Sequence, residues 1–83
     1  MPDLTDAERA LLDIEGKAWR YAGRKESAIR EATGWSQTQA MQVLNRLIDT
    51  EAALAYAPHT VKRLQRLRDK HQRTRTTRHL RRR

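Results

Sequence analysis

Apolar side chains recur at steps of three and four along the first part of the chain, as they do on one face of an α-helix. This face consists of Ala7, Leu11, Ile14, Ala18 and Tyr21, and it is widened by Leu12 and Trp19. Thr5 and Glu8 have the spacing of a capping box, and Gly23 suits a left-handed stop. The pattern predicts a helix over about residues 6–22 that forms the spine of the core.

Two shorter helices are predicted next, separated by a break at Gly34. Residues 25–32 should form the first of them, with three side chains turned inward: Ala28, Ile29 and Ala32. The break also contains Trp35, which we expect to be a half-buried cover over the joint. Ser36 and Gln39 form a second capping box, so the next helix should begin there and run to about residue 49.

The helix predicted for residues 36–49 has two different faces on a helical wheel. Its apolar face carries Ala40, Val43, Leu44, Leu47 and Ile48, with Met41 at the edge. Its polar face carries Thr38, Gln42, Asn45, Arg46 and Asp49, with Gln39 beside them. The expected centre of a three-helix core is Leu11, Ile14, Ala18, Ile29, Val43, Leu44 and Leu47.

The C-terminal part of the chain gradually loses its apolar pattern. Residues 50–57 are rich in Ala and predict a weak helical turn, and Pro58 suits the first position of a further helix. Three apolar residues are spaced to dock that helix on the core: Val61, Leu64 and Leu67. Beyond Lys70 only Leu80 is strongly apolar, and the threonines at 74, 76 and 77 are poor helix formers. We therefore expect residues 72–83 to be frayed in the absence of a ligand.

Together these patterns predict an all-α fold, a bundle of three to five helices followed by a basic C-terminal helix or tail. Residues 1–57 would form the helical core and residues 58–83 the basic segment. A chain of 83 residues is one small domain with a limited core.

Charge is divided unevenly between these two parts. Residues 1–57 contain seven basic and nine acidic side chains, whereas residues 58–83 contain eleven Lys or Arg and one acid, Asp69. The net charge is thus −2 in the first part and +10 in the second, which gives the total of +8. Such a concentration of like charge creates a positive potential suited to a polyanion. Nucleic acid is the first candidate and an anionic membrane surface the second.

Residues 25–49 have the layout of a helix-turn-helix, in which a short helix and a turn with Gly precede a capped helix with a polar outer face. Gly34, Ala40 and Val43 fit the turn and two inward sites of the repressor-type motif. The first helix is a residue longer than usual, which leaves the register of the turn open. Hydroxyl and amide side chains on the outer face can donate and accept at base edges. The same layout also occurs in proteins that bind no nucleic acid.

The polar face and the basic segment together supply the candidate DNA-binding residues. The helix contributes Gln37, Thr38, Gln39, Gln42, Asn45 and Arg46. The basic segment contributes Lys62, Arg63, Arg66, Lys70, Arg73, Arg75, Arg78, Arg81, Arg82 and Arg83. The sequence therefore predicts a protein that binds duplex DNA mainly through phosphate contacts, with the helix-turn-helix in the major groove.

Several segments match a known family over about residues 4–70. They are Leu4-Thr5-Asp6-Ala7-Glu8-Arg9, Trp19-Arg20-Tyr21-Ala22-Gly23, Lys25-Glu26, Ile29-Arg30, Ser36, Thr38, Gln42-Val43-Leu44-Asn45, Leu47-Ile48-Asp49, Ala53-Leu54-Ala55, Val61-Lys62-Arg63-Leu64 and Arg66-Leu67-Arg68. Through them the chain resembles a small actinobacterial family of short basic proteins described as nucleoid-associated. The resemblance implies a chromosome-binding protein of the bacterial cytoplasm, located in the nucleoid, but no set of contact residues. At residues 39–41 the relatives carry aromatic residues and an Arg, and this departure bears on sequence preference and binding strength.

Composition argues against several other classes of function. The chain has no Cys, which excludes disulfides and thiolate metal sites. His59, His71 and His79 have no cluster of carboxylates beside them, so we expect no metal site. Asp13 and Glu15 are two residues apart and face different directions on a helix. We therefore predict no enzyme activity and no cofactor.

Alternatives to DNA binding stay open. RNA or ribosome binding would use the same charge, but the strand-borne aromatic residues of many RNA modules are missing. An adaptor would bind RNA polymerase or another acidic partner through the polar helix. Membrane attachment is disfavoured, because no apolar stretch reaches ~20 residues and the basic helix lacks a Trp or Phe face to insert. Leu12 and Trp19 should pack against the last helix, or form a homodimer contact if the motif pairs as repressors do.

Overall fold

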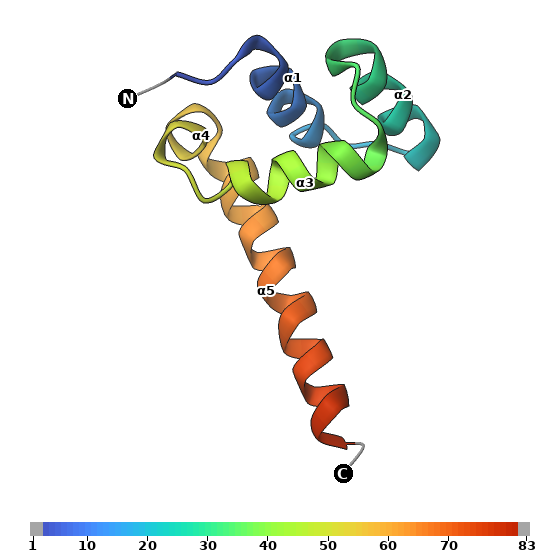
Figure 1. Cartoon of the computed structure of the whole chain (residues 1–83), viewed down its shortest axis with the longest axis vertical. Helices are drawn as coiled ribbons and strands as arrows, with labels where there is room; N and C mark the ends of the chain where they lie inside the picture. The colour runs from blue at the N-terminus through green and yellow to red at the C-terminus, as the bar shows by residue number, and fades with distance from the viewer. Residues whose placement is uncertain (1–2, 82–83) are drawn as a thin grey trace.

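The computed structural model describes the backbone of residues 3–81 and the side chains of residues 3–70. In this part of the chain the elements are α1 (Asp6–Glu15), α2 (Ala22–Thr33), α3 (Gln37–Leu47), α4 (Glu51–Tyr56) and α5 (Pro58–Arg81). The first four helices pack into a small bundle, and α5 starts in the bundle and then projects away from it (Figure 1). The predicted all-α class is confirmed.

Helix α1 begins as its sequence predicts. The backbone N–H of Glu8 donates to Thr5 Oγ1 at 3.1 Å, and the N–H of Thr5 donates to Glu8 Oε1 at 2.8 Å. This capping box satisfies two donors that the first turn leaves without helical partners. Leu11, Leu12 and Ile14 are then buried at the centre of the core.

The prediction that the first helix continues to residue 22 is wrong, because α1 ends at Glu15. Gly23 does not stop it and lies instead in the first turn of α2. Ala18 and Tyr21, which were expected in the core, are exposed. The last carbonyl groups of α1 find partners outside the helix, since Trp19 Nε1 donates to the Ile14 carbonyl at 2.7 Å.

The C-terminal end of α1 is also the place where α5 comes closest to it. Arg63 of α5 donates a hydrogen bond to the carbonyl of Glu15. A Cβ on Gly16 would lie 2.9 Å from Thr60 Oγ1, so a larger residue there would press on α5. These contacts explain why the chain turns at Gly16 although Lys17–Tyr21 could continue a helix.

Helix α2 and the turn after it follow the prediction with two exceptions, of which the first is that the helix begins at Ala22 and not at residue 25. Ile29 is fully buried, but Ala32 is exposed because the helix meets the bundle along a narrow stripe. Gly34 ends α2 in the left-handed region at φ 79°, and its N–H donates to the Arg30 carbonyl at 2.8 Å. Glycine adopts this conformation without the steric cost that a Cβ brings. Trp35 is half-buried and packs against the core, as expected.

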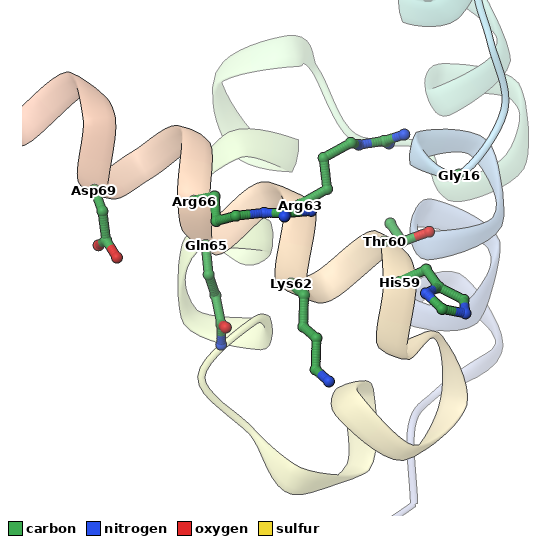
Figure 2. Close-up of a pocket in the computed structure, with 8 residues that line it drawn as sticks. All are labelled: Gly16, His59, Thr60, Lys62, Arg63, Gln65, Arg66 and Asp69. Carbon is green, nitrogen blue, oxygen red and sulfur yellow. The ribbon is translucent and has the colours of Figure 1, made fainter.

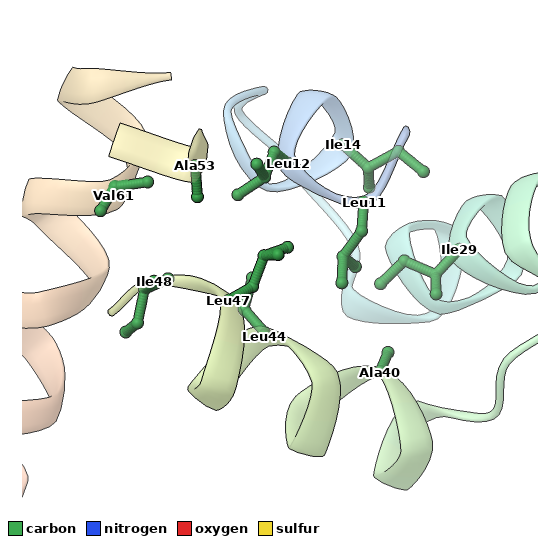
Figure 3. Packing of buried hydrophobic residues seen from close by; sticks show 10 residues of the cluster. All are labelled: Leu11, Leu12, Ile14, Ile29, Ala40, Leu44, Leu47, Ile48, Ala53 and Val61. Atoms are coloured by element: carbon green, nitrogen blue, oxygen red, sulfur yellow. The ribbon is translucent and has the colours of Figure 1, made fainter. Parts of the chain in front are cut away.

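Helix α3 has the two faces that the helical wheel predicts. Ser36 caps it, and the N–H of Gln39 donates to Ser36 Oγ at 3.2 Å. Ala40, Leu44 and Leu47 are buried against α1 and α2 (Figure 3). Val43 is half-buried and packs against this cluster. The other face carries the polar side chains into solvent.

The last two helices close the bundle on the side away from α2. In α4, Thr50 accepts from the N–H of Ala53 at 3.2 Å. Helix α5 begins at Pro58 as predicted, and Val61 is fully buried while Leu67 remains 47% exposed. The bundle therefore holds only the first turns of α5.

The expectation that residues 72–83 are frayed is wrong for the backbone up to Arg81, which is helical. Adding a residue to an existing helix costs far less than starting one, and Arg is a good helix former. The docked turns around Val61 supply the start from which the helix extends. Residues 82 and 83 lie outside the described part of the chain.

Replacing Leu44 with Ala should lower the free energy of unfolding by about 2–5 kcal/mol, because a buried leucine is removed from a small core. Urea unfolding followed by circular dichroism measures this change. Met41→Ala is the matched control on the same helix, because Met41 is 36% exposed and should cost much less. Equal losses in the two variants would contradict this assignment of the faces of α3.

Candidate nucleic-acid interface

The exposed face of α3 presents side chains that can hydrogen-bond to another molecule. Five of the six residues predicted from this helix are exposed, namely Thr38, Gln39, Gln42, Asn45 and Arg46. Gln37 differs, because its side chain is half-buried and its Oε1 atom is buried without a hydrogen-bond partner. The Gln39 side chain is also engaged, because its Oε1 accepts a hydrogen bond from the N–H of Ser36 at 3.0 Å. The accessible polar surface is thus centred on Gln42, Asn45 and Arg46.

Helix α5 carries the basic side chains predicted from its first three turns. Lys62, Arg63, Arg66 and Lys70 are all exposed. Lys62, Arg63 and Arg66 line a shallow groove of about 710 Å³, together with Gly16, His59, Thr60, Gln65 and Asp69 (Figure 2). Neither Lys62 nor Arg66 forms an ion pair with the described residues. Their charge is therefore available to an outside anion.

The direction in which α5 leaves the bundle is set by its contacts with the end of α3. Arg68 donates to both carboxylate oxygens of Asp49, at 2.9 and 3.1 Å. Gln65 Nε2 donates to the Ile48 carbonyl at 2.7 Å, which satisfies a group at the C-terminus of α3. The hydrogen bonds from Arg68 hold the pKa of Asp49 below its usual range. Two contacts on successive turns thus fix α5 relative to α3.

This arrangement places the polar face of α3 and the projecting part of α5 beside the same open region. The buried face of α3 points to α1 and α2, so its polar face points away from them. Helix α5 runs from the bundle past α3 in that direction (Figure 1). A single extended ligand can therefore meet both helices.

A further group of exposed cations lies in the connection between α1 and α2 and in the first turn of α2. Lys17 and Arg20 of the connection and Arg24 of α2 are exposed and form no ion pair within the described chain. The Arg20 guanidinium lies 6.0 Å from the centroid of the Tyr21 ring. Sequence reasoning missed this group, because it predicted one continuous helix over about residues 6–22. The signal that could have found it is the run of basic residues from Lys17 to Lys25, which contains no acid.

The remaining predicted cations belong to the far part of the chain. Arg73, Arg75, Arg78 and Arg81 lie on the helical backbone of α5, and their side chains fall outside the described residues. Arg82 and Arg83 are outside it altogether. Where the side chains are described, no group of three or more His, Asp or Glu could hold a metal ion. Among the described residues, no helix is both long and apolar enough to cross a membrane.

Comparison with known proteins assigns the chain to a family. The family model described as "Protein of unknown function (DUF3263)" matches residues 3–76, and the chain belongs to this family. No curated protein and no solved structure matches the chain. Functional inference therefore depends on the residues themselves.

Replacing Arg68 with Gln should return the pKa of Asp49 toward its ordinary value, because the hydrogen bonds from Arg68 favour the ionised carboxylate. The contribution of this pair to stability is present above the ordinary pKa of an aspartate and is lost as the pH falls through the lowered one. Carbon NMR titration of the Asp49 carboxyl group measures the change. Arg66→Gln, an exposed arginine on the same helix, is the control that should leave this titration unchanged.

Proposed function

We propose that this member of the DUF3263 family binds duplex DNA, with α3 in the major groove and α5 along the phosphate backbone. Its role would be that of a chromosome-associated protein of the nucleoid or a small transcription regulator. The observation that carries the proposal is the joint placement of an exposed polar helix and a projecting basic helix beside one open region. Each helix alone is a common feature, whereas the pair fits one ligand that offers both base edges and phosphates.

The α2–turn–α3 unit supports the major-groove part of the proposal. Three residues, Gly34, Trp35 and Ser36, separate the two helices, as in a helix-turn-helix. Gln42 and Asn45 carry amides of the type that pair with adenine, and Arg46 has the fork that pairs with guanine or phosphate. The groove of B-DNA, about 12 Å wide, admits a helix of this kind. The unit thus has the chemistry and the size for groove entry.

Helix α5 supports the proposed contacts with the phosphate backbone of DNA. With 24 residues it is about 36 Å long, close to the length of one turn of B-DNA. Residues 58–83 contain a single acid, Asp69, and Arg68 pairs with Asp49 of the preceding bundle. Each phosphate that the basic residues of α5 neutralise releases counterions, which strengthens binding at low salt regardless of sequence. Binding dominated by α5 is therefore expected to be strong but weakly selective.

The double replacement Gln42→Ala and Arg46→Ala should weaken binding to every duplex by a similar factor. Losing the Arg46 contact to phosphate should also flatten the salt slope by about one unit. If Gln42 and Arg46 read bases instead, preferred sequences would lose about 1–3 kcal/mol and other sequences less. Fluorescence anisotropy with random and AT-rich duplexes over a range of salt separates the two results.

The control for this experiment is Arg30→Ala, which removes one exposed cation from the last turn of α2, away from both helices of the interface. It should leave affinity and slope unchanged, and both variants should melt like the parent. Equal losses in Arg30→Ala and in the double variant would show that only net charge matters. Unchanged affinity of the double variant would remove α3 from the interface.

Replacing the six arginines beyond residue 72 with glutamine should weaken duplex binding sharply, while the fold is kept. The residues are Arg73, Arg75, Arg78, Arg81, Arg82 and Arg83. If 6–8 phosphates are contacted, the parent should show a slope of log K against log salt of about −5 to −7, and the variant a clearly flatter one.

Glutamine is the control built into this design, because it keeps helix propensity and length while removing charge. Deletion of residues 72–83 should give the same loss if charge alone acts there. An unchanged affinity in the glutamine variant would contradict the role of α5. Tighter binding to structured RNA than to duplex DNA at matched salt would contradict the choice of ligand.

A further inference from the structure

An apolar groove lies at the end of the bundle that is far from the tip of α5. It has a volume of about 500 Å³ and is formed between the N-terminal segment, the end of α3 and the start of α4. Its lining consists of Asp3, Leu4, Thr5, Glu8, Leu47, Thr50 and Ala52. No Lys or Arg belongs to this lining, although the protein as a whole carries a charge of +8.

The polar groups inside the groove are mostly satisfied within the protein. Thr5 Oγ1 accepts from the N–H of Glu8, and Thr50 Oγ1 donates to the Leu47 carbonyl at 2.7 Å. Glu8 Oε1 accepts from the N–H of Thr5, which leaves its second oxygen for another donor. Asp3 forms no ion pair with the described residues. The groove therefore offers an apolar floor with two carboxylates at its rim.

A second, smaller hollow continues the groove across α4. It shares Asp3, Leu4 and Ala52 with the first and extends the lining to Ala55 and Tyr56. Its one cation, Arg9, is already engaged by the Leu4 carbonyl at 2.7 Å and by Asp6. The combined surface is thus elongated and apolar, with a negative rim, which suits a basic helix that carries an apolar side chain.

The same protein carries such a helix. Leu67 of α5 is 47% exposed, although Gln65 and Arg68 on either side of it contact the end of α3. Arg63 is exposed and lies one turn earlier on the same side of α5, and its guanidinium also donates to the Glu15 carbonyl. The exposed Arg66 directly precedes Leu67 in the chain. We propose that the groove binds the Leu67 segment of α5 from a second copy of this chain.

The geometry of the chain excludes pairing within one molecule. The contacts of Gln65 with the Ile48 carbonyl and of Arg68 with Asp49 hold this part of α5 against the end of α3, so Leu67 cannot enter the groove of its own molecule. Because the groove and the helix are different surfaces, the contact is head-to-tail and can repeat in an open row. The net charge of +8 opposes it, so the contact depends on bringing the acidic end against the basic helix. The proposal does not rest on DNA binding.

The test uses two variants that each remove one side of the contact. Asp3→Lys with Ala52→Lys blocks the groove and reverses its charge, and both positions lie at the groove without a side-chain hydrogen bond. Leu67→Glu removes the apolar side chain of α5. Sedimentation of the full chain without DNA, at low salt and rising concentration, should show the parent above its monomer mass of 9.8 kDa and each variant at that mass.

Mixing the two variants is the decisive step. One molecule then has an intact groove and the other an intact helix, so the mixture should form a dimer of about twice the monomer mass and nothing larger. Leu54→Glu is the matched control, because Leu54 is 38% exposed outside both surfaces and its replacement should leave association unchanged. Circular dichroism melting of each variant confirms that the fold is kept.

Four results would overturn the proposal. The parent could remain a monomer at millimolar concentration and low salt. Folded variants could associate as the parent does, or the mixture could fail to dimerise although the parent associates. Capture of an unrelated basic peptide by a monomeric parent would also overturn it, since the groove would then serve a different partner.

Discussion

The early end of α1 at Gly16 is the constraint on which the rest of the structure depends. At this point the carbonyl groups of Ile14 and Glu15 leave helical pairing and accept from Trp19 and Arg63. The Glu15 side chain, which is only 5% exposed, pairs with Lys25 of α2 at 2.9 Å. One helix end thereby positions both α2 and α5, and a buried carboxylate in such a place is costly to leave without its partner.

Helix α3 links the core to the candidate interface. Leu44 and Leu47 hold it against α1, and the opposite face holds the polar side chains of the proposed DNA contact. Its C-terminal end receives Gln65 and Arg68 from α5, so it also directs the basic helix. Stability and the geometry of the interface are therefore coupled through one short helix. Its backbone holds Leu44 and Leu47 in the core and also sets the direction of the exposed Gln42 and Asn45 side chains.

The charge of the chain is used in two opposite ways. At the N-terminal end, Asp6 and Glu8 stabilise the start of α1 through its dipole, and they keep that end of the bundle acidic. At the other end, residues 58–83 carry eleven Lys or Arg and a single acid, Asp69. Within its described part, α5 carries both the exposed cations proposed to contact phosphate and the exposed Leu67. The two proposals consequently share α5, and Arg63 and Arg66 belong to both of the surfaces concerned.

The sequence by itself determined the features that depend on neighbouring residues. The capping boxes at Thr5 and Ser36 and the left-handed Gly34 act over at most four residues, so their hydrogen bonds follow directly from the local sequence. The two faces of α3 follow from helical spacing in the same way. The segregation of charge, on which the candidate interface was predicted, is likewise a property of the sequence alone.

Only the tertiary structure decided where α1 ends, which cations lie in the α1–α2 connection, and where α5 points. Residues 16–21 have no strong helix breaker apart from Gly16, so their local sequence permits a helix to continue. The contact that accompanies the turn joins Arg63 to Glu15, 48 positions apart. The contact that directs α5 joins residues 19 positions apart, Asp49 and Arg68. The spacing of apolar residues along the chain cannot reveal such pairs, because the two residues come into contact, and stabilise the fold, only after the helices have packed.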